Sequence, residues 1–380
     1  MKILYLAHRI PYPPNKGDKI RSFHQIKLLS ETCQIDLVCL VDDPGDFNYV
    51  PDLEKYCRTV KAFPLNRKVA KVKGGLNLLA GGTISVAYFH RPDAQRAVDE
   101  LLANNHYDAI VCFSSVMAEY VFRAKDHIQQ AKLIMDFCDV DSDKWRQYAT
   151  EAGLLLRTIY QTEFRRLLAY EQKVNQAFAG SVFVTQQEAD LFKSLYPAAK
   201  NLHVVRNGVD HQFFNASADF PKLEKSYPTL VFTGAMDYHA NVDAVTWFCR
   251  EIWPGVKKSV PDCQFYIVGS KPTPAVQNLA TLKDVVVTGF VDDIRSYYDI
   301  ADVCVTPLRL ARGVQNKVLE AMAMGKAVVT TTKAANGVGA SASQHLLVAD
   351  DSTDFAASVL SLLGNSTDKE QLGKRAADFV

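Results

Sequence analysis

The sequence predicts an α/β protein built from two doubly wound parallel sheets, one in each half of the chain. Short apolar runs typical of buried strands alternate with segments of helical periodicity along both halves. A length of 380 residues is long for a single core, and a polar, irregular stretch with two prolines interrupts the alternation at 211–228. We therefore predict an N-terminal domain at 1–210, a linker at 211–228 and a C-terminal domain at 229–380.

The N-terminal half contains seven runs that we interpret as strands, which are 2–7, 35–41, 59–65, 109–113, 132–136, 181–185 and 202–206. Helical periodicity predicts helices at 20–30, 69–79, 93–103, 116–123 and 154–178, and another that opens at 185–186. A strand that leads through a glycine-containing loop into a helix, as at 2–30, is the usual beginning of a doubly wound sheet. The loop lacks the G-x-G-x-x-G spacing, so it does not predict a dinucleotide site.

The C-terminal half begins a fresh alternation. Its predicted strands are 230–233, 264–268, 285–288, 303–306, 327–330 and 346–348. Helices are predicted around 244–248, after the capping pair Asp292-Asp293, up to Met324, and at 353–363 and 369–379. Together the two halves predict two similar sheets that are covered by helices.

Composition limits the class of protein. A net charge of +1 argues against nucleic acid as a partner, and 48% hydrophobic with 22% charged residues is typical of a soluble globular chain. The eight cysteines show no C-x-x-C spacing, and no apolar run is long enough for a signal peptide or a membrane span. We therefore expect a cytoplasmic protein. A basic cluster at 67–73 before apolar 76–80 fits a solvated helix face, and it also fits a peripheral contact with anionic lipid at the inner face of the cell membrane.

The stretch 302–332 has the form strand, loop, helix, strand, and it is the strongest candidate site. Gly313 lets backbone approach a phosphate closely, and the helix that follows directs free N–H groups at the same spot. Arg312 and Lys317 add positive charge suited to a diphosphate. Glu320 shares a helix face with Lys317 and is placed to hold ribose hydroxyls. The alternative is an ordinary βαβ unit with a structural Lys–Glu pair.

A second group of polar residues follows the strand at 132–136. Asp139 comes directly after this strand, where carboxylates point into the ligand crevice of an open α/β sheet. Asp141 and Asp143 are better explained as N-terminal caps of the next helix.

Three segments together resemble one family. LEAMAMGKAVV is similar to the signature region of GT-B glycosyltransferases of family 4, which are retaining sugar-nucleotide transferases. MKILYLAHRIPYPPNKGDKIRS and DFCDVDSDKWRQYA resemble most the sugar transferase associated with the PEP-CTERM/exopolysaccharide system. The chain departs from the family pattern at Arg312, where a glutamate is usual, and at Cys138, where many members have histidine. It also lacks the Arg and Lys that often follow Gly234.

The resemblance implies a GT-B enzyme whose two domains face each other across a cleft. It implies catalytic roles for Asp139, Arg312 and Lys317, with Arg312 and Lys317 stabilising the leaving diphosphate. The donor-binding residues that it implies are Gly17, Gly234, Val291, Gly313, Val314 and Glu320, with Val291 at the base and Glu320 at the ribose. No metal and no cofactor are expected, because the nucleotide-diphosphate sugar is a co-substrate and the acceptor is a glycan or a lipid-linked molecule. A sugar-nucleotide epimerase of the same fold and a degenerate, non-catalytic scaffold remain as alternatives.

Overall fold

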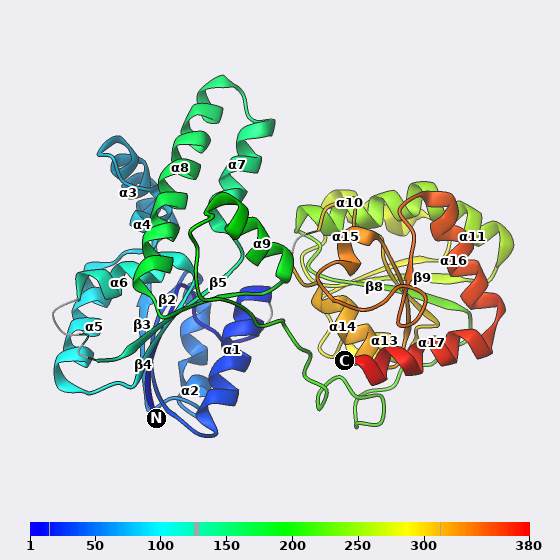
Figure 1. Ribbon diagram of the computed structural model, residues 1–380. Coiled ribbons are helices and arrows are strands. Elements are labelled where there is room, and N and C mark those ends of the chain that lie inside the picture. The colour runs from blue at the N-terminus through cyan, green and yellow to red at the C-terminus, as the bar shows by residue number, and fades with distance from the viewer. Residues whose placement is uncertain (15, 125–127, 129, 312) are drawn as a thin grey trace. The chain divides into compact units, whose positions relative to one another are not determined.

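The computed structural model divides the chain into two compact units, Met1–Arg206 and Asn207–Val380 (Figure 1). It describes residues 1–14, 16–124, 128, 130–311 and 313–380, and at Glu151 the backbone alone. Among these described residues, no helix combines the length and the apolar character needed to cross a bilayer.

Unit 1 is built on a seven-stranded parallel sheet with the order β3-β2-β1-β4-β5-β6-β7. The strands are β1 Lys2–Ala7, β2 Gln34–Val41, β3 Thr59–Pro64, β4 Ala109–Phe113, β5 Lys132–Cys138, β6 Gly180–Phe183 and β7 Leu202–Val204. The helices are α1 Gly17–Ser30, α2 Val50–Leu53, α3 Arg67–Leu79, α4 Ile84–Phe89, α5 Pro92–Asn104, α6 Ala118–Arg123, α7 Asp141–Glu151, α8 Leu154–Ala177 and α9 Gln186–Leu195. Short 3-10 turns at Pro44–Tyr49 and Ser115–Met117 complete the described elements.

Unit 2 repeats the plan with a six-stranded parallel sheet in the order β10-β9-β8-β11-β12-β13. The strands are β8 Thr229–Thr233, β9 Gln264–Val268, β10 Val285–Gly289, β11 Val303–Thr306, β12 Ala327–Thr330 and β13 Leu347–Val348. The helices are α10 His239–Trp247, α11 Trp253–Ser259, α12 Pro274–Gln277, α13 Arg295–Ile300, α14 Asn316–Ala323, α15 Thr332–Ala335, α16 Ser352–Gly364 and α17 Ser366–Phe379. A π-helical turn, Phe248–Ile252, joins α10 to α11. The predicted pair of doubly wound parallel sheets is therefore confirmed.

Alternation along the strands produces an apolar core on each face of each sheet. In β1, Leu4 and Leu6 belong to one core cluster, whereas Tyr5 and Ala7 belong to the cluster on the other face. The strands of unit 2 divide in the same way between two clusters. Because both faces are buried, the strands are continuously apolar, which is typical of parallel sheets.

A buried polar connection joins α1 to β5. The Asp136 carboxylate accepts from Arg21 Nε at 2.9 Å and from Gln25 Nε2 at 2.6 Å, while its other oxygen accepts from the backbone N–H of Cys138 at 3.0 Å. Arg21 Nη1 also donates to the carbonyl of Val205 at 2.7 Å. One guanidinium thus links the first helix, the fifth strand and the end of unit 1.

The start of α7 corrects the predicted capping role of Asp141 and Asp143. The N-cap position is Val140, no side chain caps from there, and Asp141 is already the first helical residue. Two buried glutamates from other helices supply the acceptors: Glu188 accepts from the Val140 N–H at 2.7 Å, and Glu171 accepts from the Ser142 N–H at 3.0 Å. Burial and the charge of Asp141 raise the pKa of Glu171 to about 8.

The predicted linker packs on unit 2. Phe220 is buried in one of the cores of unit 2, and the Arg295 guanidinium lies 4.1 Å from the centre of the Phe213 ring. Ser296 Oγ donates to the carbonyl of Pro221 at 2.6 Å. The segment 207–228 contains no helix or strand, yet these contacts make it part of the second unit.

Candidate functional site

In unit 2 the order of the strands reverses between β8 and β11. Open α/β sheets bind ligands beyond the carboxyl ends of their strands at this point. Gly234 directly follows β8, and the loop that contains Gly313 follows β11. Two segments predicted as binding elements therefore leave the sheet at the position where a ligand is expected. Arg312, predicted in the same loop, lies outside the described residues.

Lys317 projects from the first turn of α14 into a confined setting. Its Nζ donates to Asn241 Oδ1 at 2.7 Å and lies 4.1 Å from the centre of the Phe232 ring. Burial lowers the pKa of Lys317 to about 7, although the charge of Glu320 acts in the opposite direction. A neutral amide and an aromatic ring compensate a buried ammonium poorly, so this position favours an incoming anion.

Gly234 lies against the same ammonium. Its φ is +151°, and a Cβ placed there would be 2.8 Å from Lys317 Nζ and 2.6 Å from Asn241 Nδ2. The backbone after β9 also lies close to Gly234, because a Cβ on Gly269 would be 1.8 Å from the Gly234 carbonyl oxygen. The end of β8 thus favours glycine, and the half-buried backbone of Gly234 adjoins the Lys317 ammonium.

Glu320 is held by a tyrosine rather than by Lys317. Tyr298 OH donates to Glu320 Oε2 at 2.9 Å and shares a hydrogen bond of 2.8 Å with Thr233 Oγ1. Burial raises the pKa of Glu320, while the bond from Tyr298 and the charge of Lys317 oppose this effect. Among the described residues, Lys317 and Glu320 therefore interact through their charges but form no direct ion pair, since each side chain hydrogen-bonds to a partner on a different element.

The remaining predicted residues of unit 2 surround this group. Gly313 has φ +60°, in the left-handed region, and its carbonyl oxygen would be 2.1 Å from a Cβ on Gly337. Val314 and Val291 are half-buried and pack against the same core cluster as Tyr298. At the start of α14, the buried Asn316 Oδ1 has no hydrogen-bond partner among the described residues.

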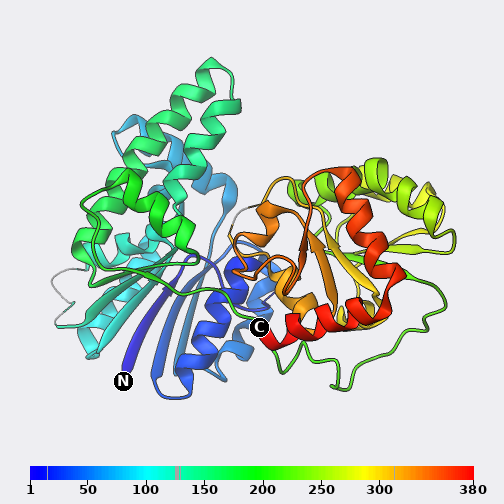
Figure 2. The same ribbon diagram turned by 45° about the vertical axis from the view of Figure 1, so that its right-hand side comes forward.

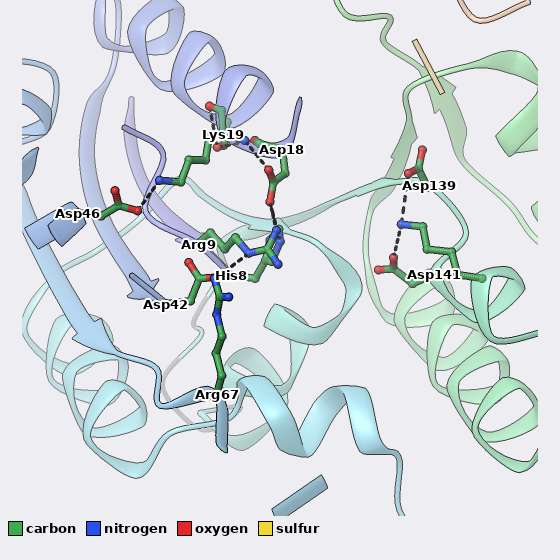
Figure 3. A network of polar contacts seen from close by, with 11 residues as sticks. His8, Arg9, Asp18, Lys19, Asp42, Asp46, Arg67, Asp139 and Asp141 are labelled. Atoms are coloured by element: carbon green, nitrogen blue, oxygen red, sulfur yellow. Dashed lines mark hydrogen bonds and ion pairs between the residues drawn. The ribbon is translucent and has the colours of Figure 1, made fainter. Parts of the chain in front are cut away.

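Unit 1 carries a charged network at the carboxyl ends of β1 and β2, drawn in Figure 3. Asp18 Oδ2 lies 2.6 Å from Arg9 Nη1 and 3.5 Å from His8 Nε2. Arg9 Nε also lies 3.4 Å from Asp42, whose carboxylate is 2.7 Å from Arg67 Nη2. Burial opposes ionisation of Asp18, but hydrogen bonds and charges from His8 and Arg9 outweigh it and hold its pKa well below the usual range.

His8 is the unusual member of this network. Its ring stacks on Phe113 at 5.9 Å between centroids and meets the edge of Phe89 at 5.4 Å. Its second nitrogen, Nδ1, is buried without a hydrogen-bond partner among the described residues. His8 is absent from the residues predicted from the sequence, although a polar residue directly after a buried strand is the same signal that points to Asp139.

Gly17 and Asp139 occupy the loops that were predicted for them. Gly17 is the exposed first residue of α1, and a Cβ there would meet nothing within 4 Å. Asp139 follows Cys138, whose φ is +62°, and its Oδ2 lies 3.3 Å from Lys144 Nζ. Lys144 also lies 2.9 Å from Asp141, so the two aspartates share one cation (Figure 3).

Metal ligands do not gather in the described part of the chain: no three His, Cys, Asp or Glu side chains there are placed to hold an ion. The expectation that no metal is required stays a prediction. Besides His8, the structure adds Asn241, Tyr298 and Lys144 to the candidate residues. None of these three follows a motif, and each is identified only by the residue it contacts in the fold.

Comparison with known sequences finds a family similarity within the second unit. Residues 227–365 match the family described as "Glycosyl transferases group 1", and this range includes Gly234, Lys317 and Glu320. A curated relative is the "Uncharacterized 44.6 kDa protein in cps region" of Klebsiella pneumoniae, 21% identical over 396 residues, with 100% of this chain and 95% of the relative covered.

Several solved structures resemble this chain over 99–100% of its length. Sucrose-phosphate synthase from Thermosynechococcus elongatus has a TM-score of 0.70 at 15% identity, covering 100% of this chain and 94% of its own. HepE of Anabaena, solved with UDP and with UDP-glucose, has a TM-score of 0.64 at 16% identity over the same shares of each chain. WaaG, a glycosyltransferase involved in lipopolysaccharide biosynthesis, has 0.66 at 14%, over 99% and 94%. At these identities the likeness establishes the fold, which is the predicted GT-B fold.

Proposed function

From the premise that residues 227–365 match the group 1 glycosyl transferases on a GT-B fold, we propose that this protein is a retaining glycosyltransferase. Its donor is a nucleotide-diphosphate sugar, and its acceptor is a glycan or a lipid-linked molecule of cell-envelope or exopolysaccharide synthesis. The cps region named for the Klebsiella relative supports this setting. UDP is the first nucleotide to test, because HepE was solved with UDP and UDP-glucose.

The observation that carries the proposal is the half-buried, weakly compensated ammonium of Lys317 beside the backbone of Gly234. Its ammonium contacts a neutral amide and a ring, and its pKa of about 7 reflects the cost of that burial. A diphosphate supplies the missing negative charge. The same contact stabilises the charge that develops on the leaving diphosphate as the bond to the sugar breaks.

The other residues of unit 2 take roles around this contact. Glu320, oriented by Tyr298, accepts from the ribose hydroxyls, and the absence of side chains at Gly234 and Gly313 lets backbone N–H groups reach phosphate oxygens. The backbone at Val291 binds the base, and Val314 lies near the end of the loop between β11 and α14, on the diphosphate side. Arg312 remains a predicted second cation.

Unit 1 contributes to the sugar and acceptor side in this proposal. Gly17 supplies an open helix start, and Asp139 supplies a carboxylate that Lys144 holds in place. His8 adds a ring nitrogen that has no partner among the described residues. Attack on the same face as the leaving group, with the leaving phosphate accepting the acceptor proton, accounts for retention without a protein nucleophile.

Titration calorimetry with UDP, GDP and ADP tests donor binding. Glu320→Ala should weaken the preferred nucleotide by about tenfold to a hundredfold, because a charge-assisted hydrogen bond contributes about 1.5–3 kcal/mol. Glu370→Ala, an exposed change on α17, should leave affinity unchanged. If Glu320→Ala binds as tightly as the wild type, the ribose assignment is wrong.

Incubation with a panel of sugar nucleotides separates the proposal from its alternatives. Slow release of free nucleotide supports transfer, and the anomeric configuration of a product read by NMR checks retention. Conversion to a different sugar nucleotide supports epimerisation, whose acid and base would come from carboxylates that follow β5, such as Asp139 and Asp141. Absence of both binding and turnover supports a scaffold.

A further inference from the structure

Unit 1 contains a pocket of about 570 Å³ that is lined by residues of α3, α4, α6 and α8. Its described lining includes one carboxylate, Glu119, and four side chains that normally carry positive charge. We call it the basic pocket, and its cations are Lys73, Arg123, Arg166 and Lys173.

The basic pocket has more positive charge than its own residues neutralise. Glu119 lies 2.7 Å from Arg123 Nε, but Arg166 donates to the backbone carbonyl of Gly82, and Lys173 lies over the Phe122 ring. Lys73 uses one of its three N–H groups on the carbonyl of His90. Burial, together with the charges of Arg123 and Arg91, lowers the pKa of Lys73. An anion that enters the pocket would relieve the repulsion among these cationic side chains.

An exposed apolar stripe adjoins the basic pocket on α3. Four residues at helical spacing share one face of this helix and are each 63% to 86% exposed, namely Val69, Val72, Leu76 and Leu79. Lys68 and Lys73 border a shallow hollow along this stripe. Lys73 lines both the hollow and the basic pocket, so apolar and cationic surfaces are continuous.

The hairpin of α7 and α8 adds a second apolar projection. Leu154 and Leu155 at the start of α8 are 86% and 78% exposed. Figures 1 and 2 both show this hairpin and α3 projecting from the same end of unit 1. Contiguous exposed apolar side chains are unusual on a soluble protein and indicate an interaction surface.

We propose that this end of unit 1 docks on an anionic phospholipid bilayer, with the apolar stripe at the headgroup–acyl boundary and a lipid phosphate in the basic pocket. Charge complementarity favours a lipid surface, because the apolar stripe on α3 is flanked by Lys68, Lys71 and Lys73 and this helix holds no acidic residue, unlike the mixed charges of a protein interface. Shallow burial of apolar side chains is weak by itself and becomes stable when cationic contacts are added. The inference does not depend on sugar transfer, since it is tested by binding alone.

The experiment is co-sedimentation of the full chain with vesicles of phosphatidylcholine, alone or mixed with phosphatidylglycerol. The wild type should bind the mixed vesicles, and its binding should weaken as salt is added. Lys173→Gln should weaken binding about fivefold, as expected for one cation near an anionic surface. Leu76→Ser should weaken it about tenfold through lost apolar burial. Lys283→Gln and Leu282→Ser, exposed positions of unit 2, are the matched controls and should change nothing.

Each result decides the proposal. Because Lys173 and Leu76 are exposed, far-ultraviolet circular dichroism should show both variants folded, and selective loss in both confirms the surface. Equal binding to both kinds of vesicle, or equal losses in the unit 2 controls, overturns it. If the protein ignores vesicles while inorganic phosphate binds in a manner that Lys173→Gln abolishes, the pocket is a site for a free anion and the lipid assignment is wrong. Failure here leaves nucleotide binding by unit 2 unaffected, so the two proposals fail separately.

Discussion

Replacement of Lys317 by methionine should stabilise the protein while removing nucleotide binding. Methionine fills a similar volume but carries no charge, so the variant removes the buried ammonium and keeps contact with the Phe232 ring. A residue kept for binding a ligand should cost stability when the ligand is absent. The substitution therefore separates a functional lysine from a structural one.

The magnitude follows from the pKa of the lysine. Its depression from 10.5 to about 7 corresponds to about 5 kcal/mol of cost for the charged form, at about 1.4 kcal/mol for each pKa unit. In the variant, the Asn241 amide oxygen is left without its donor, which costs about 2 kcal/mol and offsets part of this gain. We expect a net gain of about 3 kcal/mol in the free energy of unfolding.

The pH dependence gives the effect a signature. A lysine whose pKa is lower in the folded state destabilises the fold fully below about pH 7 and not at all above its unfolded pKa. The gain of Lys317→Met should therefore be largest near pH 6 and should vanish near pH 9, where the remaining cost of the charged lysine equals the cost of about 2 kcal/mol at Asn241. Near pH 10 the variant should be the less stable protein. Urea unfolding across this range, followed by circular dichroism, measures it.

Nucleotide affinity is measured on the same samples. UDP binding should fall at least thirtyfold in Lys317→Met, since removing one partner of a buried charge pair costs about 2 kcal/mol or more. In the wild type, affinity should decline as pH rises above about 7, because only the protonated lysine attracts the diphosphate. Lys326→Met is the matched control: Lys326 also has a pKa lowered by burial, but it follows the opposite end of α14 and donates to the Asp299 carbonyl. A less stable Lys317→Met variant that binds UDP normally would refute the reasoning.

Three further predictions concern other parts of the fold. Gly234→Ala should lower the free energy of unfolding by about 1–3 kcal/mol and weaken UDP binding more than tenfold, since a Cβ would lie 2.8 Å from Lys317 Nζ. Gly325→Ala is the control: its φ of +67° makes a side chain strained but nothing lies within 4 Å, so it should lower stability and leave UDP binding unchanged. Asp18→Asn should cost about 2 kcal/mol at pH 7 in urea unfolding, and this difference should shrink below about pH 4, where a carboxylate with a depressed pKa loses its contribution; a constant difference would contradict the ion-pair explanation. Glu171→Gln should flatten a decline in wild-type stability between about pH 5 and pH 8, because an acid with a raised pKa stabilises the fold only while protonated; parallel profiles would show that Glu171 does not titrate in this range.

The strands could be predicted from the sequence because parallel strands are apolar on both faces. Runs such as 264–268 and 327–330 correspond residue for residue to β9 and β12. Helix α4 could not be predicted in this way. Its residues, ISVAYF, are apolar and largely suited to a strand. The first N–H groups of this helix are satisfied by the Thr83 cap, which accepts from Val86 at 3.2 Å, and by Glu163 on α8, which accepts from Ile84 and Ser85 at 2.6 and 2.8 Å. A distant carboxylate here overrides the local preference.

The candidate site, like the fold, could be predicted from the sequence only in part. Glycines and charges that follow strands, such as Gly234 and Asp139, could be found because a doubly wound sheet brings strand ends to one edge. The partners of the charged residues could not be found. Sequence spacing suggested that Lys317 pairs with Glu320, whereas the fold supplies Asn241 and Tyr298 from helices far along the chain. Side-chain pairing in a core depends on packing between elements, which helical spacing alone does not determine.

The Arg21 guanidinium makes the loops after β1 and β5 mechanically dependent on each other. It joins the helix that begins beside Asp18 to the strand that leads to Asp139, and it also grips the Val205 carbonyl just before unit 1 ends. A substitution in either loop should therefore shift the other, and paired substitutions should be non-additive even where no side chains touch. A kinetic defect in an Asp139 variant should therefore be compared with the defect of Arg21→Lys. A shift of the loop after β5, transmitted through the Arg21 contacts, would have the same kinetic effect as loss of the Asp139 carboxylate.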